Sequence, residues 1–409
     1  MNERERYPVL SVEEAQQRIL ALVTPLPVEE LPILQTLGRV LAEDIVADRD
    51  VPPLDNSAMD GYALRAADTA VATPEQPVAL RVVAELPAGQ VLARKVDQGE
   101  AVRIMTGAPI PAGADAVVRF EDANLDGEYV LIGFAARPGD NVRRTGEDVH
   151  RGNVVLPTGL PVRPQEIGML ASLGRTQARV HRRPRVALLA TGDEVVEVDT
   201  APGPGQIRNI NSYTNAAQVY KWGGEPLLLG VARDRTAELS AYMRTALDAH
   251  VDLLVTSGGV SAGDFDLVKD VLAAQGRIDF WWVNMKPGRP MAFGMLQHTP
   301  LLALPGNPVA AMISLELFGR PAIRKMLGYR SWEWPAVTAR LRDPIRRKDG
   351  RRHYLRVRLV NTPTGREAVL TGEQGSGILT SLVAADGLAV IPENCDHLDA
   401  GSAVTVLLF

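Results

Sequence analysis

The chain has 409 residues and a formal net charge of −5, with 46% apolar and 23% charged residues. These values are ordinary for globular proteins, and they give no indication of a nucleic-acid or membrane partner. The length predicts two to four domains, at roughly 100–200 residues per domain. Cys395 is the only cysteine, so no internal disulfide can form. The first residues are charged and no apolar run follows them, which predicts no signal peptide and a cytoplasmic location.

Two regions of different sequence composition make up the first half of the chain. Ser11-Val12-Glu13-Glu14 predicts a capping box that begins a helix, and a second short helix is expected near Leu37–Ala42. From about Leu54 to Arg185, glycine and proline are frequent and short β-type runs alternate with turn signals. This composition and pattern predict one or two small β-rich domains, with a short helix at 164–173.

Strands and helices alternate from Arg185 onward. We predict strands at Arg185–Ala190, Pro226–Val231, Val251–Thr256, Phe280–Asn284 and Leu301–Leu304, and helices at Ser212–Trp222, Thr236–Ala249, Phe265–Ala274 and Val309–Met326. This order predicts a doubly wound α/β domain with a parallel sheet and helices on both faces. After about Tyr329 the pattern returns to strands, which predicts a small C-terminal β-barrel.

Ligands of open α/β sheets bind beyond the carboxyl ends of the strands. One loop there, Ser257-Gly258-Gly259, follows a predicted strand, and its glycines allow main-chain amides to cradle a phosphate. Asp264 is placed to cap the following helix, whose positive end favours an anion. We predict an anionic, phosphate-bearing ligand here, although a tight turn without a ligand explains this loop alone equally well.

Other charged residues fall at the same predicted edge. Lys286 and Arg289 flank a Pro-Gly turn, which can place two cations on one anion, although a solvated turn explains the motif in isolation. Carboxylates together with substrate phosphates are the usual ligands of Mg²⁺, and taken singly each is more often a cap or a surface charge. The acidic residues at this edge are Asp193, Glu194, Asp234, Asp264 and Asp266.

Two polar segments lie outside the predicted α/β domain. Asp55–Ala63 mixes turn formers with residues that can be buried, and Arg143–Asp148 places two cations and two acids around a glycine. Such segments can reach over a site from a neighbouring domain or subunit. Salt bridges between domains explain them as well.

The segments, taken together, resemble the molybdopterin molybdenumtransferases, the family of bacterial MoeA and the E domain of gephyrin. They occur in the family order and span most of the chain. The matching segments are Asp55–Ala63 (DNSAMDGYA), Ile104–Val118 (IMTGAPIPAGADAVV), Arg143–Asp148 (RRTGED), Ala190–Glu194 (ATGDE), Thr256–Asp266 (TSGGVSAGDFD), Met285–Pro290 (MKPGRP) and Leu304–Val309 (LPGNPV).

The resemblance implies a homodimer that inserts molybdate into adenylylated molybdopterin and releases AMP, with Mg²⁺ as cofactor. It implies a discontinuous N-terminal linker and dimerisation domain, an inserted β-rich domain, a molybdopterin-binding α/β domain and a C-terminal β-barrel. The linker and dimerisation domain would cover residues 1–53 and 142–182, and the inserted β-rich domain residues 54–141. The α/β domain would cover residues 183–328 and the barrel residues 329–409. Molybdopterin adenylyltransferase and the chaperones of molybdoenzymes are further expected partners; nucleic acid and membrane are not.

The resemblance also assigns roles to residues. The expected catalytic residues are Asp60, Asp148, Glu194, Asp234, Asp264, Asp266 and Lys286, and the expected metal ligands are Asp234 and Asp266. The expected substrate-binding residues are Arg143, Thr191, Ser257, Gly258, Gly259, Ser261, Pro287, Gly288, Arg289, Pro305, Gly306, Asn307, Pro308, Arg356 and Ser381. Of these, Asp60, Arg143 and Asp148 would approach from the neighbouring subunit, and Arg356 with Ser381 would contact molybdate.

Three positions depart from the usual family pattern. Trp282 and Arg289 stand where lysine is usual, and Ala310 stands where many members have serine. The loss of a lysine at Trp282 raises the alternative of a paralogue that prefers another oxyanion, tungstate. Two further alternatives are a molybdopterin adenylyltransferase, which shares the α/β domain but lacks the β-rich domains, and a non-catalytic scaffold that keeps the dimer.

Overall fold

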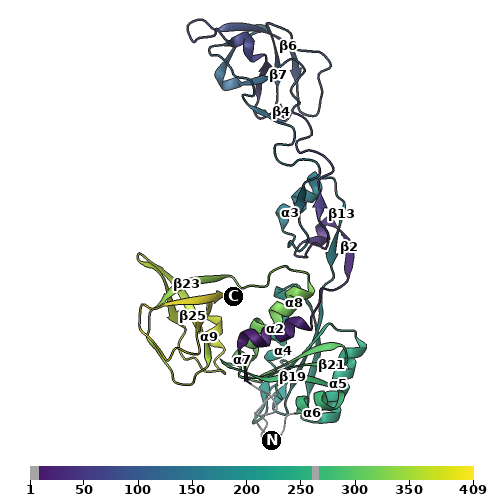
Figure 1. The fold of residues 1–409 in the computed structure, drawn as a ribbon, viewed down its shortest axis with the longest axis vertical. Coiled ribbons are helices and arrows are strands. Elements are labelled where there is room, and N and C mark those ends of the chain that lie inside the picture. Colours follow the sequence, from purple (N-terminus) through teal and green to yellow (C-terminus); the bar gives the residue numbers. More distant parts are fainter. Residues whose placement is uncertain (1–8, 260–266) are drawn as a thin grey trace. The chain divides into compact units, whose positions relative to one another are not determined.

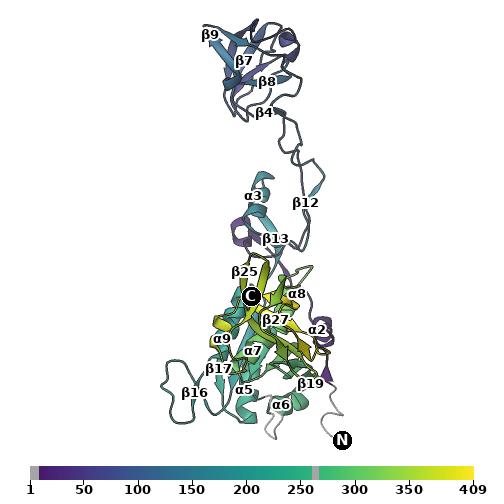
Figure 2. The same ribbon diagram turned by 90° about the vertical axis from the view of Figure 1, so that its left-hand side faces the viewer.

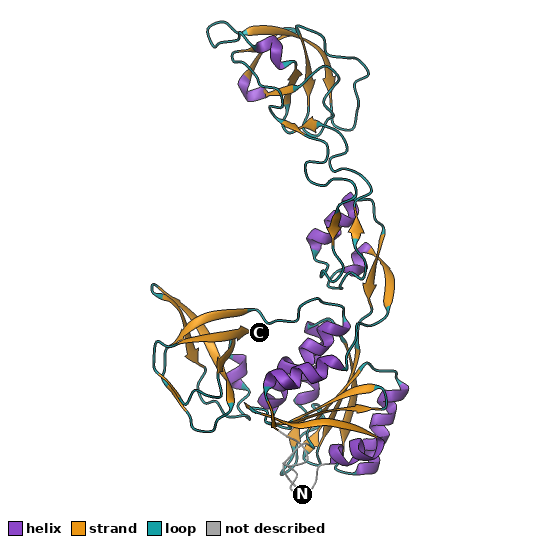
Figure 3. Ribbon diagram, viewed as in Figure 1, coloured by secondary structure: helices purple, strands orange, loops and turns teal. Residues whose placement is uncertain are grey.

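The computed structural model describes residues 9–259 and 267–409, which form two compact units (Figure 1). Unit 1 contains Met1–Ala42, Gly159–Arg163 and Ala178–Phe409, and unit 2 contains Glu43–Thr158 and Pro164–Gln177. In Figure 3, most helices flank the α/β sheet of unit 1, whereas unit 2 and the C-terminal region consist mainly of strands and loops with a few short helices. No helix in the described part of the chain is long and apolar enough to cross a membrane.

A seven-stranded sheet forms the centre of unit 1. Its strands in spatial order are β1 (Val9–Leu10), β19 (Gly276–Val283), β21 (Pro290–Leu296), β22 (Thr299–Leu304), β18 (Leu253–Ser257), β14 (Arg185–Thr191) and β17 (Glu225–Ala232). The predicted all-parallel sheet is wrong in one respect, because β21 runs antiparallel between β19 and β22. The Pro-Gly turn after β19 sends the chain straight back as a hairpin, which needs no crossover helix.

Helices cover both faces of this sheet, as predicted (Figure 1). Alternate residues of β14 face opposite sides: Val186 and Leu188 belong to one core cluster, and Ala187 and Leu189 to the other. The first face is covered by α2 (Val12–Ala21), α4 (Asn211–Lys221), α7 (Pro308–Ser314), the π-helical η4 (Leu315–Gly319) and α8 (Arg320–Met326). The second face is covered by α5 (Thr236–Asp248) and α6 (Leu267–Gln275).

The order of connections locates a ligand edge. From β14 the chain passes through α4 to β17 on one side, and α5 then returns it to β18 on the other side of β14. Such a reversal leaves a crevice beyond the carboxyl ends of the two central strands. The carboxyl ends of β14, β18 and β22 lie level, since Ser257 pairs with both Ala190 and Leu304.

The predicted start of α2 is confirmed. Glu14 N–H donates to Ser11 Oγ at 3.1 Å, and Ser11 N–H donates to the Glu14 carboxylate at 2.9 Å. The helix then buries Val12, Ala15 and Ile19 in the core.

The helix predicted near Leu37–Ala42 is wrong. A short 3-10 turn, η1 (Ile33–Thr36), precedes this segment, and Gly38 then takes a φ of +73° that ends helical geometry. The Leu41 N–H donates to the carbonyl of Leu160 at 3.0 Å instead of to its own segment. Tertiary pairing with a distant part of the chain therefore overrides the local apolar pattern.

Unit 2 is built around a six-stranded sheet, three strands of which are labelled in Figure 2. In spatial order the strands are β8 (Ala116–Arg119), β5 (Gly61–Leu64), β7 (Glu100–Ile104), β6 (Val78–Leu86), β10 (Tyr129–Ile132) and β9 (Ala123–Asp126). The expected helix at 164–173 is present as α3 (Pro164–Ser172). Short elements complete the unit: β3 (Ile45–Val46) with β12 (Val154–Leu156), β4 (Asn56–Ser57) with β11 (Val142–Arg143), η2 (Ala66–Thr69) and η3 (Phe120–Asp122).

The predicted C-terminal barrel is confirmed. Its strands follow the order β25 (Arg352–Thr362), β26 (Gly365–Leu370), β23 (Ala336–Leu341), β29 (Ala403–Leu408) and β27 (Gly387–Ile391), and β27 pairs with β25 to close the sheet. β20 (Met285–Lys286) joins this barrel to the α/β sheet by pairing with β25. The remaining elements of unit 1 are β2 (Val28–Pro32) with β13 (Gln177–His181), β15 (Val195–Val196) with β16 (Ile207–Arg208), β24 (Ile345–Arg346) with β28 (His397–Leu398), and α9 (Thr380–Val383).

Candidate active site

The Ser257-Gly258-Gly259 segment lies at the reversal of strand order. Gly258 and Gly259 have φ values of +97° and +66°, a region that L-residues with side chains rarely occupy. A Cβ atom on Gly258 would lie 2.5 Å from the Thr191 carbonyl oxygen. The Gly258 N–H donates to the Leu304 carbonyl at 3.0 Å. Only glycine therefore lets this main chain pack against the end of β14.

A small pocket opens at this edge. It brings together three of the predicted loops, because Thr191, Ser257 and Gly306 all line it. Asn211, at the start of α4, also lines it and donates from Nδ2 to the Gly306 carbonyl at 2.8 Å. The Asn211 Oδ1 atom is buried without a hydrogen-bond partner within the described chain. The Asn-x-Asn run at 209–211 was the sequence signal for this residue.

Two of the predicted acids lie together at the same edge. The main-chain N–H of Asp193 approaches the Asp234 carboxylate at 3.4 Å, and the N–H of Asp234 approaches the Asp193 carboxylate at 3.3 Å. Both residues are exposed. Within residues 9–259 and 267–409, no group of three or more His, Cys, Asp or Glu side chains is placed to hold a metal. The predictions for Ser261, Asp264 and Asp266 lie outside the described residues.

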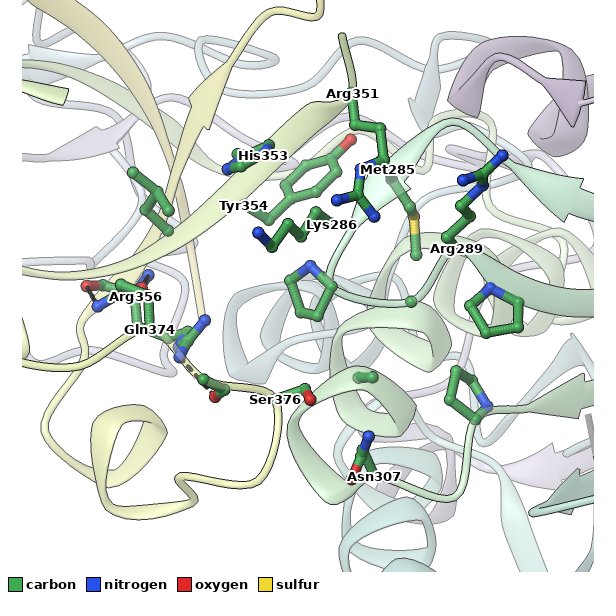
Figure 4. A pocket seen from close by; sticks show the side chains of 17 residues that line it. Met285, Lys286, Arg289, Asn307, Arg351, His353, Tyr354, Arg356, Gln374 and Ser376 are labelled. Carbon is green, nitrogen blue, oxygen red and sulfur yellow. Dashed lines mark hydrogen bonds between the residues drawn. The ribbon is translucent and has the colours of Figure 1, made fainter. Parts of the chain in front are cut away.

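A second, larger pocket lies between the loop after β19 and the barrel strand β25 (Figure 4). We call it the basic pocket; its volume is about 630 Å³. Four lysine or arginine side chains line it, and no aspartate or glutamate is among the described lining residues. Such a surface favours an anion of more than one charge. The cations are Lys286, Arg289, Arg351 and Arg356, and the predicted residues Pro287, Gly288, Pro305 and Asn307 also line the pocket.

Lys286 and Arg289 do not converge on one point. In Figure 4 their side chains extend away from each other. Lys286 Nζ lies 3.8 Å from the Asp349 carboxylate, whereas the Arg289 guanidinium lies over the ring of Trp282, 5.8 Å from its centroid. The turn between them requires glycine, since a Cβ on Gly288 would lie 2.5 Å from Ser314 Oγ.

Arg356 and Ser381 are brought together, although they are distant in sequence. Arg356 is fully buried, and its Nε donates to Ser381 Oγ at 3.0 Å. Its Nη2 donates to the Gly375 carbonyl at 2.9 Å. Burial lowers the pKa of the Arg356 guanidinium to about 10, so the group remains charged at neutral pH. The C-terminal barrel therefore carries a fixed positive charge on the wall of the basic pocket.

Sequence reasoning missed a group of residues at the start of β25. Asp349 accepts hydrogen bonds from Arg351 Nη2 at 2.6 Å and from His353 Nε2 at 2.9 Å. Burial lowers the pKa of His353, which is thus neutral at pH 7 and donates through Nε2. Burial alone would raise the pKa of Asp349, but the hydrogen bonds from His353 and Arg351 outweigh it and the pKa is lowered. The Asp-Gly turn within a basic run at 346–353 was the available signal.

In unit 2, the structure brings Asp55–Ala63 and Arg143–Asp148 against each other. β4 and β11 pair Arg143 with Asn56, and Asp55 accepts from Arg144 Nη1 at 2.7 Å. Asp60 accepts from the N–H and hydroxyl of Thr106, and the N–H bond is the larger cause of its lowered pKa. Asp60, Arg143 and Asp148 are all exposed, so their side chains can reach a ligand or another chain.

A mixed α/β sheet with a glycine-lined crevice beyond its strand ends, next to a β-barrel and a basic pocket, is the architecture of an α/β protein with a ligand site at the strand ends. Comparison with known proteins narrows the class. Residues 10–174 match the MoeA N-terminal region (domain I and II), residues 187–325 a probable molybdopterin binding domain, and residues 338–409 the MoeA C-terminal region (domain IV).

Relatives match almost the whole chain. Molybdopterin molybdenumtransferase 2 of Mycobacterium tuberculosis is 38% identical over 407 residues, covering 97% of this chain and 98% of that protein. The molybdopterin molybdenumtransferase of Haemophilus influenzae is 35% identical over 405 residues, with 97% and 98% covered. A crystal structure of the molybdopterin biosynthesis MoeA protein of Pyrococcus horikoshii matches with a TM-score of 0.86 at 33% identity, covering 98% of this chain and all of that one. The chain belongs to the molybdopterin molybdenumtransferase (MoeA) family.

Proposed function

We propose that the protein inserts molybdate into adenylylated molybdopterin and releases AMP, thereby forming molybdenum cofactor. Full-length relatives named molybdopterin molybdenumtransferase support the transfer reaction. The basic pocket is the observation that supports this reaction for the present chain. It shares the Pro305–Asn307 loop with the edge of the sheet at Ser257-Gly258-Gly259, which we call the glycine edge. An oxyanion and a phosphate-bearing pterin can thus be held side by side within unit 1.

In this proposal, one pocket binds the phosphate and pterin and the other binds the oxyanion. The glycine edge, together with Thr191 and Asn211, would hold the phosphate and pterin, and Asn307 borders the basic pocket beside it. Lys286 and the buried Arg356 would hold the oxyanion, with Ser381 keeping the Arg356 guanidinium in place. Fixed cations of this kind neutralise charge that develops on a phosphate as its anhydride bond breaks.

Mg²⁺ is proposed as the cofactor. Mg²⁺ at phosphate sites is usually held by one or two carboxylates together with substrate oxygens and water. Asp234 fits this mode because it is exposed at the edge of the sheet, and Asp193 lies next to it. Asp266 is the second proposed ligand. The metal would neutralise phosphate charge, while Glu194, which follows Asp193 on its loop, would orient water.

The second subunit is proposed to complete the site. Asp60, Arg143 and Asp148 of unit 2 are exposed and belong to the segments that resemble the family most specifically. In a homodimer they would face the pockets of unit 1 of the other chain. Molybdopterin adenylyltransferase, as the supplier of substrate, and chaperones of molybdoenzymes remain proposed partners, and the cytoplasm remains the proposed location.

The proposal is tested by incubating purified protein with adenylylated molybdopterin, molybdate and Mg²⁺ and measuring AMP. We expect AMP release that depends on molybdate. We also expect Asp266→Ala to reduce it strongly without changing the thermal unfolding midpoint. Ligand binding without AMP would instead support a scaffold, and consumption of ATP with unmodified molybdopterin would support an adenylyltransferase.

Tungstate preference is a second candidate, which the stacking of Arg289 on Trp282 favours. This stack turns a cation of the loop away from Lys286, which changes the charge offered to the oxyanion. Rates of cofactor formation with tungstate and with molybdate at equal concentrations distinguish the two. Equal or faster turnover with molybdate would rule the tungstate candidate out.

A further inference from the structure

Asp349 is an acid placed against a pocket wall that is otherwise cationic. It follows β24 in the barrel and contacts three of the groups that line the basic pocket: Arg351 at 2.6 Å, His353 at 2.9 Å and Lys286 at 3.8 Å. Arg347 Nη1 lies 4.0 Å from the same carboxylate. Asp349 therefore supplies negative charge where the described lining residues supply none.

The three contacts differ in strength. Arg351 reaches Asp349 through both Nε and Nη2, at 3.1 and 2.6 Å, and such two-point contacts fix a guanidinium in place. Lys286 makes only the 3.8 Å contact, and its side chain is 52% exposed. A long, exposed pair of this kind contributes little stability, so Lys286 can leave Asp349 easily. Asp349 thus holds Arg351 firmly and Lys286 loosely.

The backbone keeps the Lys286 side chain within reach of both Asp349 and the basic pocket. β20 pairs with β25 so that Lys286 stands opposite His353, whose side chain is buried beside Asp349. The Lys286 side chain also borders the basic pocket, and Figure 4 shows it in the same part of the pocket as His353 and Arg351. Rotation of the lysine side chain alone is enough to move its charge from Asp349 to an anion.

We propose that Asp349 is the resting counter-ion of Lys286, which an incoming oxyanion displaces. This positioning role rests on the proposed function, because it assumes that the basic pocket binds the oxyanion. Competition from Asp349 weakens oxyanion binding and thereby eases release of the oxyanion toward the pterin.

The test compares molybdate, a tetrahedral dianion, with perrhenate, a tetrahedral monoanion of similar size. Calorimetric titration of the full-length protein at constant ionic strength and pH 7.5 gives a dissociation constant for each. We expect Asp349→Asn to tighten binding of both anions by about the same factor, roughly twofold to fivefold, because freeing Lys286 from its exposed pair costs the same whichever anion arrives. A gain for molybdate that is the square of the gain for perrhenate would indicate direct repulsion by Asp349 and would overturn the inference. Glu367→Gln is the matched control: Glu367 pairs with Arg342 in the same barrel, does not line the basic pocket, and should leave both constants unchanged.

A double-mutant cycle with Lys286→Met isolates the competition. If Asp349 acts by holding Lys286, the gain from Asp349→Asn should disappear in the Lys286→Met background. Unchanged or weaker binding in Asp349→Asn would overturn the inference while leaving the pocket intact, and so would a gain that survives Lys286→Met. Binding of neither anion by the wild-type protein would instead overturn the basic pocket itself as the oxyanion site, and the proposed function with it.

Discussion

Arg356 shows how one buried side chain joins two parts of the barrel. Its guanidinium is planar and reaches the Ser381 hydroxyl and the Gly375 carbonyl at the same time. A lysine keeps the charge but cannot reproduce this fork. The arginine is therefore both a structural group and the fixed cation of the basic pocket.

Arg356→Lys should lower the free energy of unfolding by about 1–3 kcal/mol, because buried acceptors lose their donors. The measurement is urea unfolding followed by circular dichroism. Arg366→Lys is the control: Arg366 is exposed on the neighbouring strand, and its replacement should change stability by less than about 0.5 kcal/mol. Equal effects of the two substitutions would show that the Arg356 fork contributes nothing.

His353 predicts how stability depends on pH. Burial lowers its pKa below the ordinary value of 6.5, so the folded chain binds this proton less readily than the unfolded chain does. The neutral ring contributes to the free energy of unfolding above pH 6.5. This contribution is lost as the pH falls toward the lowered pKa of the folded state. The lowered pKa of Asp349 adds a loss at still lower pH.

We therefore expect the free energy of unfolding to fall between pH 7 and pH 5. His353→Gln keeps a donor for Asp349 but does not titrate, so it should flatten this part of the curve. Urea unfolding at pH 7, 6 and 5 measures both proteins. Parallel curves would show that His353 does not contribute to the pH dependence.

At the scale of elements, the link between β18 and the glycine edge is sterically constrained. Gly258→Ala combines a positive φ with a contact to Thr191, and the two effects together should cost about 2–4 kcal/mol. Gly205→Ala is the control, because Gly205 has a φ of +77° with open space around it and should cost about 1–2 kcal/mol. Thermal unfolding compares them, and equal losses would show that the contact with Thr191 relaxes freely.

At the scale of the whole molecule, the proposed site needs two chains. Light scattering after size exclusion should give twice the mass of one chain, and a monomer at micromolar concentration would contradict this. Asp60→Asn and Lys286→Met alter unit 2 and unit 1, and each variant alone should lose AMP release. Co-expressed, they form mixed dimers with one intact site, so about a quarter of wild-type activity should return. No recovery in isolated mixed dimers would show that both residues act within one chain.

Several features could be predicted from the sequence because their causes are local. The capping box of α2 lies within four residues, and the strand and helix periods from Arg185 onward follow from burial on one or two faces. The glycine edge could be predicted because positive φ has a residue signature. The family resemblance supplied further candidate residues, including Arg356 and Ser381, whereas the hydrogen bond between these two is seen only in the structure. The division into four domains stays a prediction.

Other features depended on contacts between distant segments, which local patterns do not encode. The missing helix near Leu37 follows from a partner far along the chain, since the Leu41 N–H donates to the Leu160 carbonyl. The basic pocket exists only because β20, in the loop between β19 and β21 of the α/β sheet, pairs with β25 of the barrel, which brings Lys286 beside Asp349 and His353. The sequence by itself determined which chemistry the chain carries, since that depends on residue types and local spacing. Tertiary structure alone decided which charges meet, because Asp349 and Lys286 are far apart in the sequence and lie together only through the pairing of β20 with β25.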